Sequence, residues 1–130
     1  MSYYFTKALV NTSFEEAIEK VSAELKKEGF GIVTEIDMKE TLKRKIEVDF
    51  RKYKILGACN PHFAFKALSA ESKIGVFLPC NVVVEETADG QIEVTAVDPV
   101  ASMISVGNKD LEKLASTVRD ALRHIILNLK

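Results

Sequence analysis

Apolar residues recur with a helical period in two stretches of the chain. The first runs from Phe14 to Leu25 and follows Ser13 and Glu16, whose spacing matches a capping box. The second starts at Asn108 or Lys109, and its stripe consists of Leu111, Leu114, Val118, Leu122, Ile125 and Leu129. These two patterns predict the main helices.

Runs of β-branched, aromatic or alternating apolar residues predict five strands, over residues 3–9, 31–37, 52–59, 76–86 and 91–97. Two shorter helices are predicted over 38–46 and 61–69, with Asp37 and Asn60 as their N-caps. Leu42 and Ile46, four residues apart, are the expected buried residues of the first.

Ala88-Asp89-Gly90 predicts a hairpin turn between the last two strands, so a simple series of parallel units is excluded. This order favours an α+β fold with two layers, in which helices pack on one face of a mainly antiparallel sheet of about five strands. The chain has 130 residues and no linker or low-complexity segment, which predicts a single domain over 1–130.

The net charge is −1, which gives no general attraction to nucleic acid or to an anionic membrane. Segment 39–54 has seven basic and three acidic residues, whereas segment 85–98 has five acidic and no basic ones. Two solvated surfaces explain this asymmetry, and contact between two copies of the chain is the alternative. Because acids interrupt the basic segment, single-stranded nucleic acid is disfavoured as a partner.

The N-terminal residues do not resemble a signal peptide, and the longest uncharged stretch, Ile74 to Val84, is too short to cross a bilayer. Two cysteines do not make a disulfide framework. We therefore expect a cytoplasmic protein with free thiols and no membrane contact.

The run from Tyr53 to Pro61, Leu78-Pro79-Cys80 before a strand, and Asp98-Pro99 after a strand form a recognisable set. The chain resembles, over nearly its whole length, the uncharacterised "domain of unknown function 302" family of bacteria and archaea. The resemblance implies a compact α+β domain with an antiparallel sheet that forms homodimers, and it brings no established activity. It also implies that the Asn-Pro and Asp-Pro junctions are more widely shared than the two cysteines.

Cys59, His62 and Cys80 are candidate ligands of a divalent metal such as zinc. Cys59 and His62 lie at a strand end and in the first helical turn, a geometry that can turn two ligands toward one point. Alternatively, Cys59 near a helix N-terminus would be a reactive thiolate. Both cysteines would otherwise be buried packing residues.

The Asn60-Pro61 and Asp98-Pro99 junctions are candidate ligand-binding elements, because helix N-termini present unpaired N–H groups. The competing interpretation is that Asn60 and Asp98 are N-caps that use those donors themselves. The glycine-rich phosphate loop, the G-x-S-x-G elbow and the H-E-x-x-H motif are all missing from the sequence.

These observations lead to one main hypothesis and two alternatives. The main one is a homodimeric binding domain that holds a small ligand or metal ion near the Cys-Asn-Pro junction. The first alternative is an enzyme that uses Cys59 as a nucleophile or redox centre. The second is a structural or interaction domain whose exposed sheet face is a subunit interface.

Overall fold

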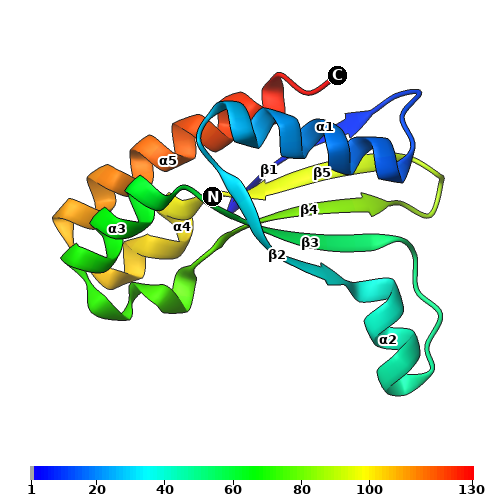
Figure 1. Ribbon diagram of the computed structural model, residues 1–130, viewed down its shortest axis with the longest axis horizontal. Coiled ribbons are helices and arrows are strands. Elements are labelled where there is room, and N and C mark those ends of the chain that lie inside the picture. Colours follow the sequence, from blue (N-terminus) through cyan, green and yellow to red (C-terminus); the bar gives the residue numbers. More distant parts are fainter. Residues whose placement is uncertain (1) are drawn as a thin grey trace.

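The computed structural model describes residues 2–130. Its strands are β1 (Tyr4–Leu9), β2 (Gly31–Asp37), β3 (Tyr53–Cys59), β4 (Cys80–Glu86) and β5 (Ile92–Val97). Its α-helices are α1 (Phe14–Lys27), α2 (Met38–Ile46), α3 (Pro61–Ala70), α4 (Pro99–Met103) and α5 (Lys109–Leu127). Two 3₁₀ helices, η1 (Ser72–Phe77) and η2 (Ile104–Val106), follow α3 and α4 (Figure 1).

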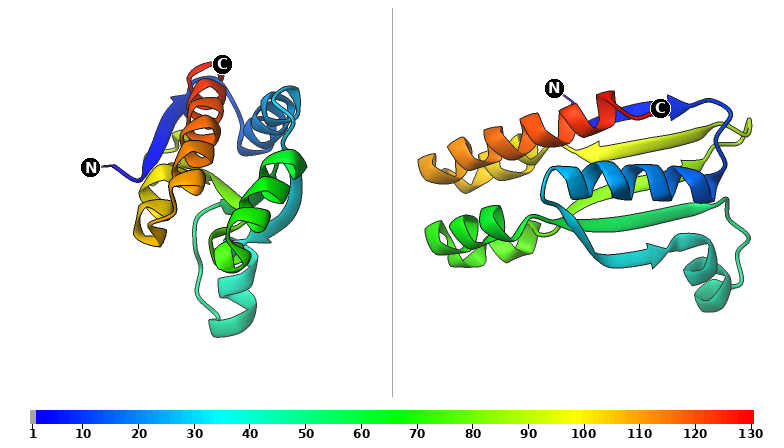
Figure 2. Two further views of the ribbon diagram at one scale, coloured as in Figure 1. Left: turned by 90° about the vertical axis from the view of Figure 1, so that its left-hand side faces the viewer. Right: turned by 45° about the horizontal axis from the view of Figure 1, so that its top comes forward.

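The five strands form one sheet in the order β1-β5-β4-β3-β2, and every neighbouring pair is antiparallel. The long helices α1 and α5 lie side by side on one face of this sheet (Figures 1 and 2). The predicted α+β fold, with an antiparallel sheet of five strands, is confirmed. No helix within residues 2–130 is long and apolar enough to cross a membrane.

The core lies between this sheet face and the two long helices. Alternate residues of the central strands face it, and all are buried: Leu56, Ala58, Val82, Val84, Val94 and Ala96. The helices contribute their apolar stripes, including Val21 and Leu25 from α1 and Leu122 and Ile125 from α5. The capping box of Ser13 and Glu16 is formed as predicted.

The fourth strand starts later than its sequence suggests. The strand was predicted over 76–86, with Pro79 at its start or at a bulge, but Ser72–Phe77 is a 3₁₀ helix and the strand begins at Cys80, directly after Pro79. The prediction was wrong because Pro79 has no N–H group to donate to a neighbouring strand, so pairing starts only after it. The Leu78–Pro79 peptide bond is cis.

Helix α2 has the predicted bounds but not the predicted burial. Asp37 caps it, accepting a hydrogen bond from the Glu40 N–H at 3.0 Å. Leu42, however, is only half-buried, and Ile46 is 62% exposed. The helix stands away from the rest of the molecule at the β2 edge, where no second element covers it (Figure 1). Its apolar residues therefore have no core to enter.

The antiparallel order brings three chain segments to one end of the sheet. Strands β3 and β5 both run antiparallel to β4, so their last residues and the first residue of β4 share that end. The Asn60-Pro61 and Asp98-Pro99 junctions therefore flank Cys80. Helices α3, α4 and the start of α5 extend beyond the sheet there (Figure 2).

Candidate functional site: an apolar cavity at the end of the sheet

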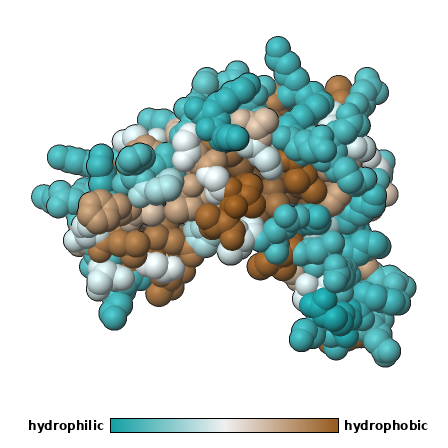
Figure 3. Space-filling view, in the orientation of Figure 1, coloured by the Kyte–Doolittle hydropathy of each residue, from teal (hydrophilic) through white to brown (hydrophobic). Residues whose placement is uncertain are grey.

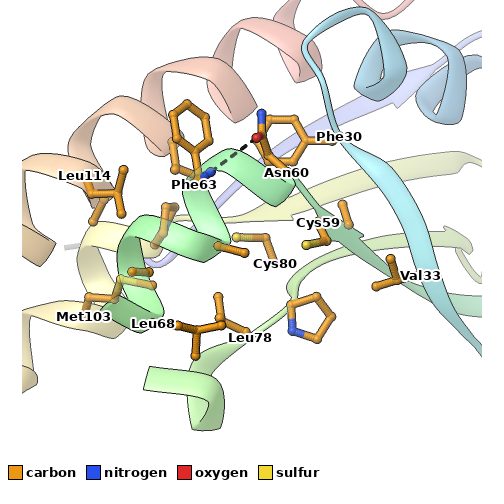
Figure 4. A pocket seen from close by; sticks show the side chains of 17 residues that line it. Phe30, Val33, Cys59, Asn60, Phe63, Leu68, Leu78, Cys80, Met103 and Leu114 are labelled. Carbon is orange, nitrogen blue, oxygen red and sulfur yellow. Dashed lines mark hydrogen bonds between the residues drawn. The ribbon is translucent and has the colours of Figure 1, made fainter. Parts of the chain in front are cut away.

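A cavity of about 290 Å³ opens between the end of the sheet and the helices that extend beyond it. The strands contribute Ala58, Cys59 and Cys80, and α3 contributes Phe63, Ala64 and Ala67. The opposite wall comes from Pro99 and Met103 of α4 and from Leu114 and Val118 of α5. Figure 4 shows these side chains around one apolar space.

The mouth of the cavity is also apolar. Val33 and Leu68 line it, and they are 61% and 45% exposed. In the space-filling view, apolar surface gathers over α3 and continues past β2 toward the base of α2 (Figure 3). Hydrocarbon surface at an opening lowers the cost for an apolar molecule to enter from water.

Both cysteines line this cavity, as free thiols. Cys80 is buried and pairs across the strands with Ala58, the residue before the half-buried Cys59. Burial raises the pKa of the Cys80 thiol to about 11, and the nearby Cys59 adds to the effect. Cys80 is therefore protonated at neutral pH and behaves as a small apolar wall residue.

Asn60 is the one lining residue with a side-chain amide, and both the oxygen and the nitrogen of that amide are hydrogen-bonded to backbone groups. Its Oδ1 accepts hydrogen bonds from the backbone N–H groups of His62 and Phe63 at 3.1 and 3.3 Å. Its Nδ2 donates to the Glu28 carbonyl at 3.3 Å. The predicted N-cap is confirmed, and it consumes the donors that an anion would need.

The second junction behaves in the same way. Asp98 Oδ1 accepts a hydrogen bond from the Val100 N–H at 2.9 Å and caps the short helix α4. Pro99 is buried and lines the cavity, whereas Asp98 does not line it. Of the four ligand-binding candidates, Asn60 and Pro99 reach the cavity, and Pro61 and Asp98 lie outside its lining.

The three metal-ligand candidates are not gathered as a group. Cys59 and Cys80 share the cavity wall, but His62 is exposed and lies outside the lining. Within residues 2–130, no three His, Cys, Asp or Glu side chains are placed to hold a metal ion. His62 is the second residue of α3 and is exposed, whereas the next residue, Phe63, lines the cavity. The geometry therefore gives the zinc hypothesis no support.

The sequence indicated the Asn60-Pro61 and Asp98-Pro99 junctions, but it did not indicate the helices that form the wall of the cavity. Phe63, Ala67, Met103 and Leu114 gave only a general apolar signal, and the last was assigned to the α5 stripe. Leu114 is half-buried, unlike its stripe neighbours Leu111 and Val118. The apolar stripe of α5 continues beyond the end of the sheet. Such a continuation indicates that the helix contacts a second apolar region there.

Comparisons with known proteins agree with this architecture. The family model described as "Domain of unknown function DUF302" matches residues 5–129. The crystal structure of an uncharacterized conserved DUF302 protein from Bacillus stearothermophilus superposes with a TM-score of 0.92 at 26% sequence identity, covering 100% of both chains. No curated protein matches the sequence. The chain belongs to the DUF302 family.

Proposed function

We propose that this protein is a binding domain that holds a small, neutral, apolar ligand in the cavity beside the Cys59-Asn60 junction. The observation that carries the proposal is the lining itself. Apolar side chains surround the space, joined by two thiols and by one amide whose oxygen and nitrogen already bond to backbone groups.

The volume of the cavity sets the size of the ligand. An apolar cavity of about 150 Å³ in another protein stays dry and takes up benzene. The cavity here is about 290 Å³, roughly twice that size, which suits two fused rings or a medium-length alkyl chain. A space of this size without polar partners is poorly suited to water and well suited to hydrocarbon.

The charge of the ligand follows from the same lining. None of the lining residues carries an ionisable group other than the two thiols. A buried charge without a partner is strongly disfavoured, so an anionic or cationic group would have to stay outside the mouth. The binding energy is therefore expected to come from burial of apolar surface.

A thiol-dependent enzyme is the alternative that the two cysteines support. Because the Cys80 pKa is raised to about 11, a thiolate nucleophile would have to come from Cys59. Free thiols also fit the reducing cytoplasm, the compartment we expect for this protein.

Fluorescence titration with N-phenyl-1-naphthylamine tests the binding proposal. We expect a saturable rise in emission, as the neutral probe leaves water. Ala64→Phe, which places a ring in the cavity, should weaken binding at least tenfold. Ala70→Phe on the same helix, at an exposed residue outside the lining, is the matched control. Binding that is unaffected by Ala64→Phe would contradict the proposed site.

A second titration tests the ligand class. Naphthalene should compete with the probe, whereas naphthalene-1-sulfonate, with the same rings and one charge, should compete at least tenfold more weakly. Equal competition by the two compounds would be consistent with the proposed site but would contradict the proposal that its ligand is neutral.

The second part of the proposal is a homodimer. It is supported by a sheet face that the helices leave uncovered and by the apolar residues exposed there. Size-exclusion chromatography with light scattering tests it, with twice 14.5 kDa as the expected mass.

A further inference from the structure

The sheet face opposite α1 and α5 carries an uncharged row across all five strands. Strand registers place these residues next to one another: Thr6, Thr95, Val83, Ile55 and Ile36, from β1 to β2. On the three central strands, most neighbours of the row on the helix-facing side are buried, namely Leu56, Val82, Val84, Val94 and Ala96, whereas those on β1 and β2 are half-buried or exposed. Along the row itself, in contrast, Thr6 and Ile36 are exposed and the other three are only half-buried.

We infer that this row, together with helix α2, is the surface on which a second copy of the chain docks. The inference rests on the homodimer proposed above and names its interface. The row itself opposes no like charges when it meets its symmetry mate face to face, and the acids of the same face, Glu85 and Glu93, flank it on one side, where Arg51 pairs with Glu85. Sheets that pack in this way interdigitate their alternate side chains about 10 Å apart.

The exposed area of the monomer supports a second copy as the occupant. The accessible surface is 7900 Å², whereas a compact monomer of 14.5 kDa is expected to expose about 6900 Å². The excess of about 1000 Å² is close to the ~800 Å² that each partner buries in a standard protein interface.

The sheet alone is too small for an interface of this area. Helix α2 is therefore included in the proposed interface, because it adds contact surface. Five strands of about six residues cover roughly 24 Å by 20 Å, or about 500 Å² of projected area. Ile36, the last residue of the row, directly precedes Asp37, the N-cap of α2. The helix therefore leaves the sheet where the row ends, and it carries no buried residue in the monomer.

Exposed apolar residues at the end of this helix fit a contact with a partner. Ile46 is 62% exposed and Val48 is 42% exposed, and both follow the basic run Lys43-Arg44-Lys45. In a twofold dimer, the α2 helix of each copy would cover the partner's sheet edge. Ile46 and Val48 would then be buried, which their chemistry favours.

The test is the molar mass in solution of the wild type and of four variants. Val83→Lys at the centre of the row and Ile36→Lys at its exposed edge should each shift the dimer to monomer, with at least a tenfold rise in the dissociation constant. Ile46→Lys on α2 should weaken the dimer as well. Val10→Lys, at a residue that is 77% exposed and outside the row, is the control and should leave the dimer unchanged.

Two results would overturn the inference, and they differ in meaning. A wild-type protein that is monomeric at micromolar concentration removes the homodimer and its interface together. A wild-type dimer that both Val83→Lys and Ile36→Lys leave intact keeps the homodimer and places its interface elsewhere. Should Val83→Lys fail to fold by circular dichroism, Ile36→Lys decides, because that side chain is already 45% exposed.

Discussion

Asn60 links two helices that are far apart in the sequence, since its side-chain Nδ2 donates a hydrogen bond to the backbone carbonyl of Glu28 at 3.3 Å. The same amide caps α3 through Oδ1. One residue therefore joins the end of α1 to the start of α3 beside the cavity. The close approach leaves little room, because a Cβ added at Gly29 would lie 2.9 Å from Asn60 Nδ2.

Asn60→Ala should lower the free energy of unfolding by about 1–2 kcal/mol, the usual cost of removing an N-cap. It should also weaken binding of the naphthylamine probe, because Asn60 fixes the first turn of the cavity wall. Asn108 is a matched control: it caps α5 through Oδ1 and donates from Nδ2 to the Ala70 carbonyl at 3.3 Å, away from the cavity. Denaturant unfolding and probe titration of both alanine variants measure the two effects. Equal loss of probe affinity in the two variants would argue against a local role for Asn60.

The sequence predicted that Asn60 caps α3, but it did not predict the hydrogen bond between Asn60 and Glu28. An Asn before Pro at the start of an apolar helical pattern indicates a cap, because the signal lies within four residues. The bond to Glu28 depends on how α1 and α3 pack, which no local pattern contains. The burial error in α2 has the same origin, since Leu42 and Ile46 have the correct spacing but face no core in the monomer. The cavity could not be predicted because its wall combines residues from six separate helices and strands.

Gly57 is required by space rather than by backbone conformation. A Cβ at this position would lie 2.6 Å from Pro79 Cγ and would also clash with the Thr34 side chain. Gly57→Ala should therefore destabilise the fold by about 1–3 kcal/mol, the usual cost of overpacking. Gly31→Ala in the adjacent strand, where nothing lies within 4 Å, should change stability far less. Chemical denaturation of the two variants checks this, and equal effects would mean that strand propensity, not crowding, determines the cost.

The buried thiol of Cys80 should make stability depend on alkaline pH. Its pKa is raised from 9.0 to about 11 in the folded protein, so the unfolded chain loses this proton at lower pH than the folded one. Stability is then unaffected well below pH 9 and falls as pH rises from about 9 to about 11, by up to about 1.4 kcal/mol per pH unit. Cys80→Ala lacks this group, so the stability of the wild type relative to the variant should decline across that range. A constant difference between the two proteins at pH 8 and pH 10.5 would contradict the burial of the thiol.

The two thiols should react with iodoacetamide at different rates. At pH 8, Cys80 is almost entirely protonated, because its pKa is about 11, and it is also buried, at 8% exposure. Cys59 is more accessible and lines the same cavity, so it should be alkylated at least tenfold faster.

Saturating naphthalene should slow the alkylation of Cys59, because a ligand in the cavity would cover this thiol. Mass spectrometry of the modified peptides gives both rates, with Cys80→Ala as the control that isolates Cys59. Protection of Cys59 in the wild type but not in Ala64→Phe would link the thiol, the cavity and the ligand in one measurement, whereas equal rates with and without naphthalene would place the ligand elsewhere.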